Sequence, residues 1–404
     1  MVTLSRNLGR WANNPTHTGI DAQYDVSYSS RPQGGSEKAV QSFAAIIEHT
    51  TARKLPIAAA VANKRCTKRS CDHTQDRCKK NYSSDQSIAS SERSLLHKAL
   101  DDVKKPRLIT LRSVTTDASA QLAKALRDYN STNNSQIMHY KCFIHRVRTM
   151  EKHIRDLQLS SIPKAHDKHA YRQKLASSIR SRIRTELKTV RNLQKNDAAF
   201  IKSAAAAIQN ITKCLSGDHR QCRLGKSYVC KSHLSTYSTS SLPYGVHLEL
   251  KDHDLSLIQK EIDKMFDEEG LNGMCKLYDT NMVESLHSGV YFLAPKTSSY
   301  SRNFPALCHS AVHSASLGPS RSTLGLIKEA GIKVYRNSPM YVQLKLKERR
   351  RKYHSKRKAS PEYKQRRYFL RKRKSNRSLF ANSLYCLEQA ASPTATEHNY
   401  GLSS

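Results

Sequence analysis

The chain has 404 residues, of which 69 are Lys or Arg and 33 are Asp or Glu, giving a formal net charge of +36. A surplus of this size attracts polyanions whatever the fold, so a nucleic acid is the expected partner. The longest apolar runs are far shorter than the ~20 residues of a membrane helix, and the amino terminus has no apolar signal segment. These features argue against a membrane protein and predict a nuclear or cytosolic one with reduced cysteines.

The first part of the chain alternates predicted strands and helices. Residues 20–28 switch strictly between apolar and polar side chains, which is the period of a β-strand. Apolar runs at 42–50 and 55–64 predict a hairpin. The elements that follow are a Cys/His-rich loop at 66–82, a helix near 92–103, a strand at 107–117, a helix from 118, a strand at 138–142 and a helix at 144–157. This order is typical of an α/β fold.

The middle of the chain predicts helices only. Over 165–270 apolar residues recur every three or four positions while Lys and Arg occupy other faces, as in amphipathic helices. Further helices are predicted at 282–293 and 320–330. Residues 345–377 contain seventeen Lys/Arg and two acids, and 378–404 are rich in Ser, so this end of the chain is predicted to be largely disordered.

Three carboxylates stand where a metal site could form. Asp25 lies on the polar face of the first predicted strand, Asp117 ends a later strand, and Glu284 lies on a predicted helix. Three such groups can hold two divalent ions about 3.5–4 Å apart for attack on a phosphodiester, and Mg²⁺ prefers oxygen ligands. On spacing alone an alternative stands: Asp117 is a helix N-cap, and the other two acids are solvated surface residues.

Two Cys/His clusters predict metal sites of a different kind. Each brings three cysteines and one histidine into a short segment, which suits a closed tetrahedral zinc site in a reducing compartment. The first cluster consists of Cys66, Cys71, His73 and Cys78, and the second of Cys214, His219, Cys222 and Cys230. The alternative for the second cluster is a polar loop between helices.

Cys142 and His145 form a smaller pair, three residues apart near the start of a predicted helix. Three interpretations are open: half of a metal site, a nucleophile with its base, or two residues in packing contact. A nucleophile needs an orienting group and an oxyanion hole, and nothing nearby in the sequence supplies either. The sequence also lacks a GxxxxGK phosphate-binding loop, so no small-molecule substrate is predicted.

Basic blocks near the carboxyl terminus predict a nuclear address, a clamp on the DNA backbone, or both. Their residues are Arg349, Arg350, Arg351, Lys352, Arg371, Lys372, Arg373 and Lys374. The alternative is a solvated, nonspecific run of charge. A nuclear location is the expectation that follows from this pattern.

Taken in chain order, these pieces resemble the Mutator-like transposase domain, within the Mutator-like DDE transposases. The family's first block is similar to "DVSYSSR", which runs from Asp25 to Arg31. The loop ending in "CKKNY", the Asp117 block "TTDASAQLAKAL" and the Cys-x-x-His of "KCFIHRVR" follow in the family's order. The segment "NMVESLHSGVYFLAPK" resembles the third block, with Glu284 as its carboxylate and His287 where Asn is frequent.

This resemblance spans about residues 20–330 and implies an RNase H-like core, a mixed sheet with flanking helices, with an all-helical insertion before the third carboxylate. The implied organisation is a core at 1–160, a helical insertion at 161–275, the end of the core at 276–335 and a basic, largely disordered tail at 336–404. Only 24 residues precede Asp25, so no separate amino-terminal DNA-binding domain is expected.

The implied function is cut-and-paste DNA transposition, with hydrolysis and strand transfer at the terminal repeats of the element. Asp25, Asp117 and Glu284 would be catalytic and bind Mg²⁺ or Mn²⁺, while Arg31, Cys142 and His145 would support the site. DNA is the implied partner, and a homo-oligomer is left open. A degenerate copy that acts as an inactive nuclear DNA-binding protein is the alternative, and a zinc-stabilised RNA-binding or structural protein is a third interpretation.

Overall fold

The computed structural model describes residues 19–29, 39–51, 53–66, 71, 73, 78–105, 109–117, 119–161, 168–230, 232, 250–371 and 373. The chain divides into two units, Met1–Ser316 and Leu317–Ser404. Within the described residues, every helix is too short or too polar to cross a bilayer.

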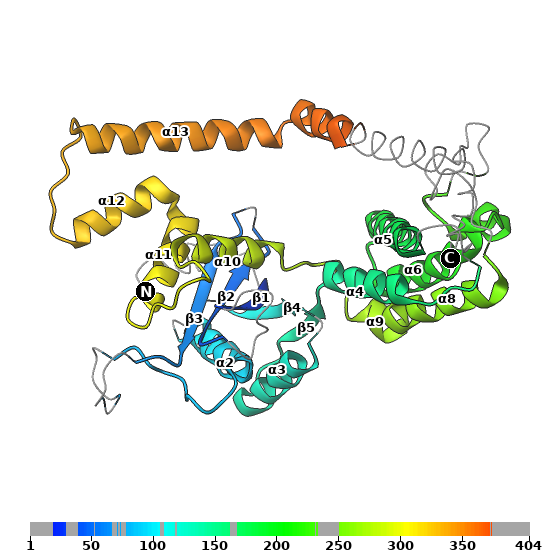
Figure 1. Cartoon of the computed structure of the whole chain (residues 1–404), viewed down its shortest axis with the longest axis horizontal. Helices are drawn as coiled ribbons and strands as arrows, with labels where there is room; N and C mark the ends of the chain where they lie inside the picture. Colours follow the sequence, from blue (N-terminus) through cyan, green and yellow to red (C-terminus); the bar gives the residue numbers. More distant parts are fainter. Residues whose placement is uncertain are drawn as a thin grey trace, which may run out of the picture. The chain divides into compact units, whose positions relative to one another are not determined.

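The first unit is built on a mixed five-stranded sheet with the strand order β3-β2-β1-β4-β5 (Figure 1). The strands are β1 (Ile20–Tyr28), β2 (Gln41–Glu48), β3 (Pro56–Asn63), β4 (Leu111–Thr116) and β5 (Met138–Lys141). The first three pair antiparallel, whereas β4 is parallel to β1 and β5 is parallel to β4. The predicted first strand, the hairpin and the α/β class are confirmed.

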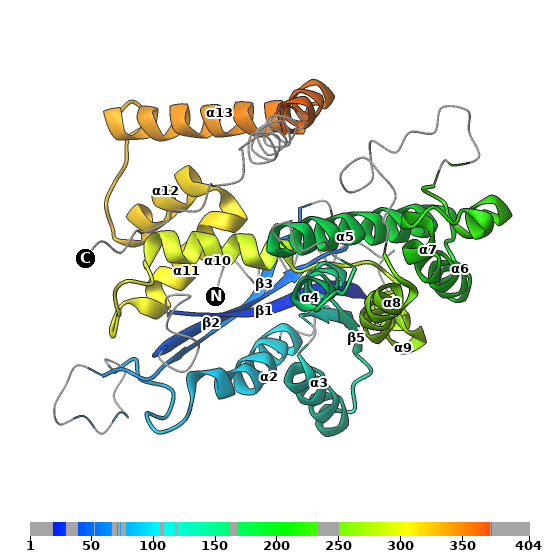
Figure 2. The ribbon, with the colours of Figure 1, turned by 45° about the vertical axis from the view of Figure 1, so that its right-hand side comes forward.

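Helices cover both faces of the sheet (Figure 2). α2 (Ser91–Lys104) and α3 (Ala120–Asn133) lie on one face, and α10 (Asn281–Leu293) and α11 (Phe304–Leu317) lie on the other. The parallel strand β4 is reached through α2, and β5 through α3, because parallel neighbours need a crossover connection. Helix α11 is not predicted by the sequence pattern.

Strand β2 shows why both faces need a cover. Its residues alternate between the two cores, with Phe43, Ala45 and Ile47 packed toward α10 and α11, and Ala44 and Ile46 toward α2. All of them are buried. A strand that is buried on both faces consists of consecutive apolar residues, and this explains the sequence "FAAII".

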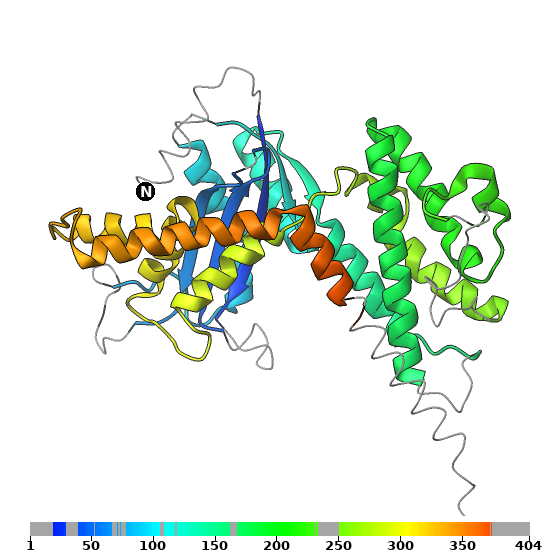
Figure 3. The same ribbon diagram turned by 90° about the horizontal axis from the view of Figure 1, so that it is seen from above.

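A helical lobe follows β5 and has its own core. It consists of α4 (Phe143–Asp156), α5 (Lys168–Leu193), α6 (Asp197–Gln209), α7 (Ile211–Leu215), α8 (Asp252–Phe266) and α9 (Glu268–Asn272). The helices form one lobe (Figure 3). Its core contains Met150, Ile183, Leu187, Phe200 and Ile262. The predicted apolar stripe of α5 is therefore the buried face of this lobe, and its Lys and Arg residues lie on the other faces.

The second unit contains α12 (Pro319–Glu329) and α13 (Pro339–Ala359), and residues 361–371 are also helical. The sequence predicts that 336–404 is largely disordered, whereas α13 is a long basic helix within this range. Ser338 caps α13 by accepting a hydrogen bond from the amide of Tyr341, and Pro339 follows in the first turn. Lys and Arg are good helix formers, so a charge block with a proper cap can be helical.

Candidate active site

The polar face of β1 is covered in the structure. Asp21, Gln23, Asp25 and Ser27 lie on this face, as the period of the strand predicts. Asp21 is 4% exposed, Gln23 is 0% exposed, and the side chain of Asp25 is 17% exposed. Asp25 is therefore not the solvated strand residue of the alternative interpretation, and its charge must be accommodated inside the protein.

Asp117 lies beside Asp25 because their strands are parallel neighbours. Gln23 pairs with Thr115, so two residues further along each strand Asp25 comes level with Asp117. The N-cap of α3 is Ser119, whose hydroxyl accepts a backbone N–H of the first turn, so the N-cap interpretation of Asp117 is wrong. Asp117 Oδ1 is buried and has no hydrogen-bond partner among the described residues. An oxygen in this state is suited to a cation.

Glu284 lies in the first turn of α10, next to residues of α4. Its Oε1 lies 3.6 Å from His145 Nε2 and accepts a hydrogen bond of 3.4 Å from the Thr280 hydroxyl. The same hydroxyl lies 3.4 Å from His145 Nδ1. The side chain of Glu284 is 35% exposed, so the carboxylate that these groups orient remains accessible to solvent.

Cys142 and His145 belong to this network. Cys142 is buried at the N-cap of α4, and its sulfur lies 3.6 Å from the Thr280 hydroxyl oxygen. Burial disfavours the thiolate, but hydrogen bonds with His145 and Thr280 outweigh it and lower the pKa of Cys142. The hydrogen bond with Cys142 also raises the pKa of His145, against an opposing effect of burial and with help from the charge of Glu284. The pair thus lies directly beside the third carboxylate.

Charge interactions connect all three carboxylates. Burial, together with the negative charges of Asp117 and Glu284, raises the pKa of Asp25 to about 7, against the opposing effect of His145. Neighbouring carboxylates that disfavour each other's ionisation form a site that gains from a bound cation.

His287 approaches Asp25 from α10 without forming an ion pair. Its Nδ1 lies 3.5 Å from Asp25 Oδ2. Burial, together with the charge of Lys296, lowers the pKa of His287 to about 3, so the ring is neutral at physiological pH. Phe43 packs edge-on against the same ring. A neutral imidazole therefore limits the space on this side of Asp25.

Residues that the sequence analysis did not single out hold α10 against β1. The Tyr278 hydroxyl donates to Asp21 Oδ2 at 2.8 Å, and the Met282 amide donates to Gln23 Oε1 at 3.2 Å. Further along, the Tyr291 hydroxyl bonds Ser27 Oγ at 3.2 Å. With the His287–Asp25 contact, each residue of the polar face meets one residue of the 278–291 segment. The strict alternation of β1 was the only sequence signal for this docking surface.

The oxygens of the three carboxylates are not gathered around one point in the structure. Within the described residues, only the two Cys/His clusters bring three or more potential metal ligands within 4.8 Å of one another. Glu284 is held toward His145 and Thr280, on the side of α4. The donor chemistry nevertheless fits Mg²⁺, since the ligands are hard carboxylate oxygens and one of them is buried without a partner.

A family model for the Mutator-like transposase matches residues 2–230, more than half of the chain. The chain belongs to the Mutator-like transposase family. The matched region includes Asp25, Asp117, the Cys142–His145 pair and both Cys/His clusters, whereas Glu284 lies beyond it. Searches of curated proteins and of solved structures find no match. The family assignment therefore rests on the first two carboxylates and their surroundings.

Both predicted Cys/His clusters come together in the structure. In the first, Cys78 Sγ lies 3.5 Å from Cys66 Sγ and 3.4 Å from His73 Nδ1, and the Cys71 sulfur lies within 4.8 Å of the other three donor atoms. In the second, His219 Nδ1 lies 3.6 Å from Cys214 Sγ and 3.5 Å from Cys230 Sγ. Cys222 completes this second group. Both sets fit a four-coordinate ion.

The basic residues of the second unit do not all remain available to a ligand. Arg349, Arg350 and Lys352 are exposed on α13. Arg351 instead forms a two-pronged ion pair with the buried Glu348, with a shorter N–O distance of 2.6 Å. Of the other predicted contacts, Arg371 and Arg373 are exposed. Arg31, Lys372 and Lys374 lie outside the described residues.

Proposed function

We propose that the protein is a cut-and-paste DNA transposase in which Asp25, Asp117 and Glu284 hold two divalent ions. The observation that carries the proposal is that the buried Asp25 lies level with Asp117 on the neighbouring parallel strand, in a chain of the transposase family. The charges of Asp117 and Glu284 both raise the pKa of Asp25, which supports their proximity. An RNase H-like core is part of the proposal. The strand order, with three antiparallel strands followed by two parallel ones, supports it. The helical lobe between β5 and α10 supports an insertion.

The residues around the three carboxylates would each contribute to this reaction. Bound Mg²⁺ or Mn²⁺ would activate the attacking water or 3′-hydroxyl and stabilise the leaving oxygen of the phosphodiester. Thr280 and His145 orient Glu284 through contacts of 3.4 and 3.6 Å. Asp117 offers a buried oxygen without a partner. Prior fixation of the carboxylates lowers the reorganisation that the reaction would otherwise require.

DNA is the proposed partner, both as element ends and as target, and the nucleus is the proposed location. The net charge of +36 and the exposed Lys and Arg residues of α13 support contacts to backbone phosphates. Zinc is the proposed metal of both Cys/His clusters, because thiolate and imidazole ligands suit it. These ions would be structural and would take no part in the cleavage.

Nicking of a plasmid that carries the element's terminal repeats tests the proposal. With Mg²⁺ or Mn²⁺ the wild type should nick the plasmid, and Asp117→Asn should reduce the rate by about a thousandfold. Asp128→Asn is the matched control, because Asp128 lies on α3 in a surface pair with Arg93. Equal rates for wild type and Asp117→Asn would exclude this active site. DNA binding without cleavage in either metal would support the inactive DNA-binding alternative.

A further inference from the structure

The second Cys/His cluster has the dimensions of a zinc site. With Zn–S of about 2.3 Å and Zn–N of about 2.0–2.1 Å, a tetrahedral ion separates a sulfur from a nitrogen ligand by about 3.6 Å. His219 Nδ1 lies 3.6 Å from the sulfur of Cys214 and 3.5 Å from that of Cys230. The three cysteines are 3–6% exposed and form a small buried core of their own. The donors are therefore positioned for an ion before it arrives.

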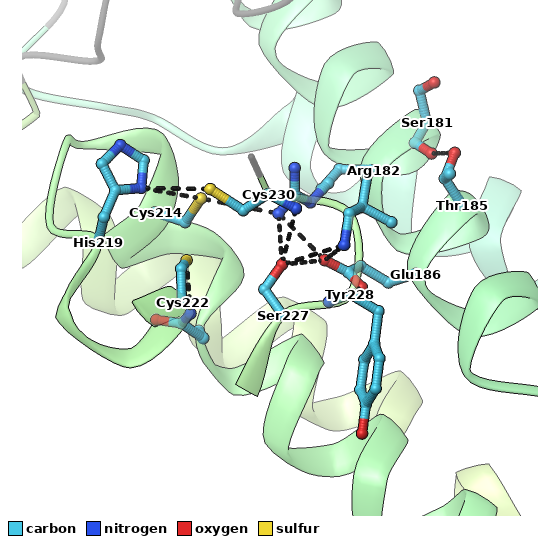
Figure 4. A network of polar contacts seen from close by, with 12 residues as sticks. Ser181, Arg182, Thr185, Glu186, Cys214, His219, Cys222, Ser227, Tyr228 and Cys230 are labelled. Carbon is cyan, nitrogen blue, oxygen red and sulfur yellow. Dashed lines mark hydrogen bonds and ion pairs between the residues drawn. The ribbon is translucent and has the colours of Figure 1, made fainter. Parts of the chain in front are cut away.

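A charged group of α5 contacts this donor set. Arg182 Nη2 lies 3.7 Å from Cys214 Sγ and donates to the Ser227 hydroxyl at 2.8 Å (Figure 4). Three thiolates around Zn²⁺ leave one net negative charge, which a guanidinium in this position stabilises. On the other side, Asn210 donates from Nδ2 to Cys222 Sγ at 3.0 Å. Two of the sulfurs thus have hydrogen-bond donors of their own.

A buried carboxylate on the same helix fixes the loop that carries Cys230. Glu186, with 1% of its side chain exposed, lies one turn from Arg182 and pairs with it at 3.0 Å. Its oxygens accept hydrogen bonds from the Ser227 hydroxyl at 2.5 Å and from the Tyr228 amide at 3.0 Å. Ser227 in turn accepts from the Cys230 amide at 3.0 Å. Hydrogen bonds therefore connect Arg182 to Cys230 through Ser227, as Figure 4 shows.

The first cluster differs in its surroundings. His73 is exposed, and Cys66, Cys71 and Cys78 are only partly buried. Lys80 Nζ lies 3.4 Å from His73 Nε2, at the surface. Solvent and small chelators can therefore approach the first donor set, whereas the second lies against α5.

We propose that the second cluster is a preorganised, slowly exchanging Zn²⁺ site and that Arg182 and Glu186 form its outer shell. The inference rests on the proposed zinc assignment and is independent of DNA cleavage. Outer-shell partners of metal ligands typically change metal affinity by about 10–100-fold when they are removed. The two clusters should accordingly differ in how fast they release zinc.

Zinc release from the full chain to a colorimetric chelator tests this. The wild type should release zinc in a fast and a slow phase. Cys71→Ser should remove the fast phase, and Cys214→Ser the slow one. Arg182→Gln should accelerate the slow phase by about tenfold or more and leave the fast phase unchanged. Arg180→Gln is the matched control, because Arg180 lies on the same helix but pairs with Glu151.

A second variant distinguishes loss of the outer-shell contacts from misfolding. Ser227→Ala removes one hydroxyl between Arg182, Glu186 and Cys230, and should accelerate the slow phase without loss of helical circular dichroism. If zinc is bound at Cys214 but leaves at the same rate from wild type, Arg182→Gln and Ser227→Ala, the outer-shell role is excluded. If Cys214→Ser does not lower the zinc content, the zinc assignment itself fails. Neither outcome bears on plasmid nicking, which tests the catalytic proposal.

Discussion

A single buried carboxylate, Asp25, lowers the stability of the fold when it is ionised. Its pKa moves from an ordinary 3.8 to about 7 through burial and the charges of Asp117 and Glu284. The folded chain therefore binds the proton more tightly than the unfolded chain does. The resulting loss of stability begins as the pH rises above 3.8 and is fully present above about 7. A cation beside the carboxylates would reverse this loss.

Asp25→Asn should therefore stabilise the metal-free protein at pH 8. Because the variant removes an unfavourable buried charge, its melting temperature in EDTA should rise by roughly 3–6 °C, with little gain at pH 4. Mg²⁺ should stabilise the wild type but not the variant. Thermal melts with and without EDTA measure these melting temperatures. Asp156→Asn is the control, because it makes the same substitution at an exposed site. A lower melting temperature for Asp25→Asn at pH 8 would contradict the argument.

At the scale of elements, α10 and β1 fit one another over their length. The nine residue steps from Met282 to Tyr291 rise about 13.5 Å along the helix, and the four steps from Gln23 to Ser27 rise about 13.4 Å along the strand. Their hydrogen bonds at the two ends therefore form in the same register. This match fixes where Glu284 comes to lie relative to Asp25, so the polar face of β1 acts as a positioning surface.

Tyr278→Phe tests this positioning. Loss of the hydroxyl that donates to Asp21 removes a tether just before α10, so Glu284 should be held less firmly. We expect a several-fold higher Mg²⁺ requirement for nicking, with unchanged DNA affinity and little change in melting temperature. Tyr129→Phe is the control, because its hydroxyl donates to Asp101 on the other side of the sheet. An unchanged Mg²⁺ requirement in Tyr278→Phe would exclude the positioning role.

The sequence predicted the strands and helices that carry this site, but it did not predict which distant residues contact them. The period of β1 is a local signal and describes the strand correctly, whereas the N-cap of α3 is Ser119 and not Asp117. What covers the polar face of β1 is not local, since Tyr278 lies 257 residues from Asp21. Helix α11 was missed because its many small residues give no clear apolar stripe. Helix α13 was missed because its charges surround it, and only its cap marks it as a helix.

At the scale of the whole molecule, the distribution of charge determines which basic residues are available for contacts to DNA. The helix α13 contains nine Lys/Arg and one acid, Glu348, which is paired with Arg351. Glu348 is buried and approaches the position of Gly318, at the start of α12, so this pair holds α13 to its own unit. The same helix thus pairs one arginine, Arg351, with Glu348 and leaves Arg349, Arg350 and Lys352 exposed to solvent.

The salt dependence of DNA binding should separate these two uses of charge. Each phosphate contact contributes about 0.9 to the slope of log K against log salt, so converting Arg349, Arg350 and Lys352 to Gln should lower the slope by about 2–3. Converting Lys98, Lys104 and Lys124, which are exposed on α2 and α3, removes the same charge and should lower it by less. Arg351→Gln should instead reduce stability, because it leaves Glu348 buried and unpaired. Fluorescence anisotropy with a duplex at several salt concentrations gives the slopes. Equal losses for the two triple variants would mean that net charge alone, and not the face of α13, governs DNA binding.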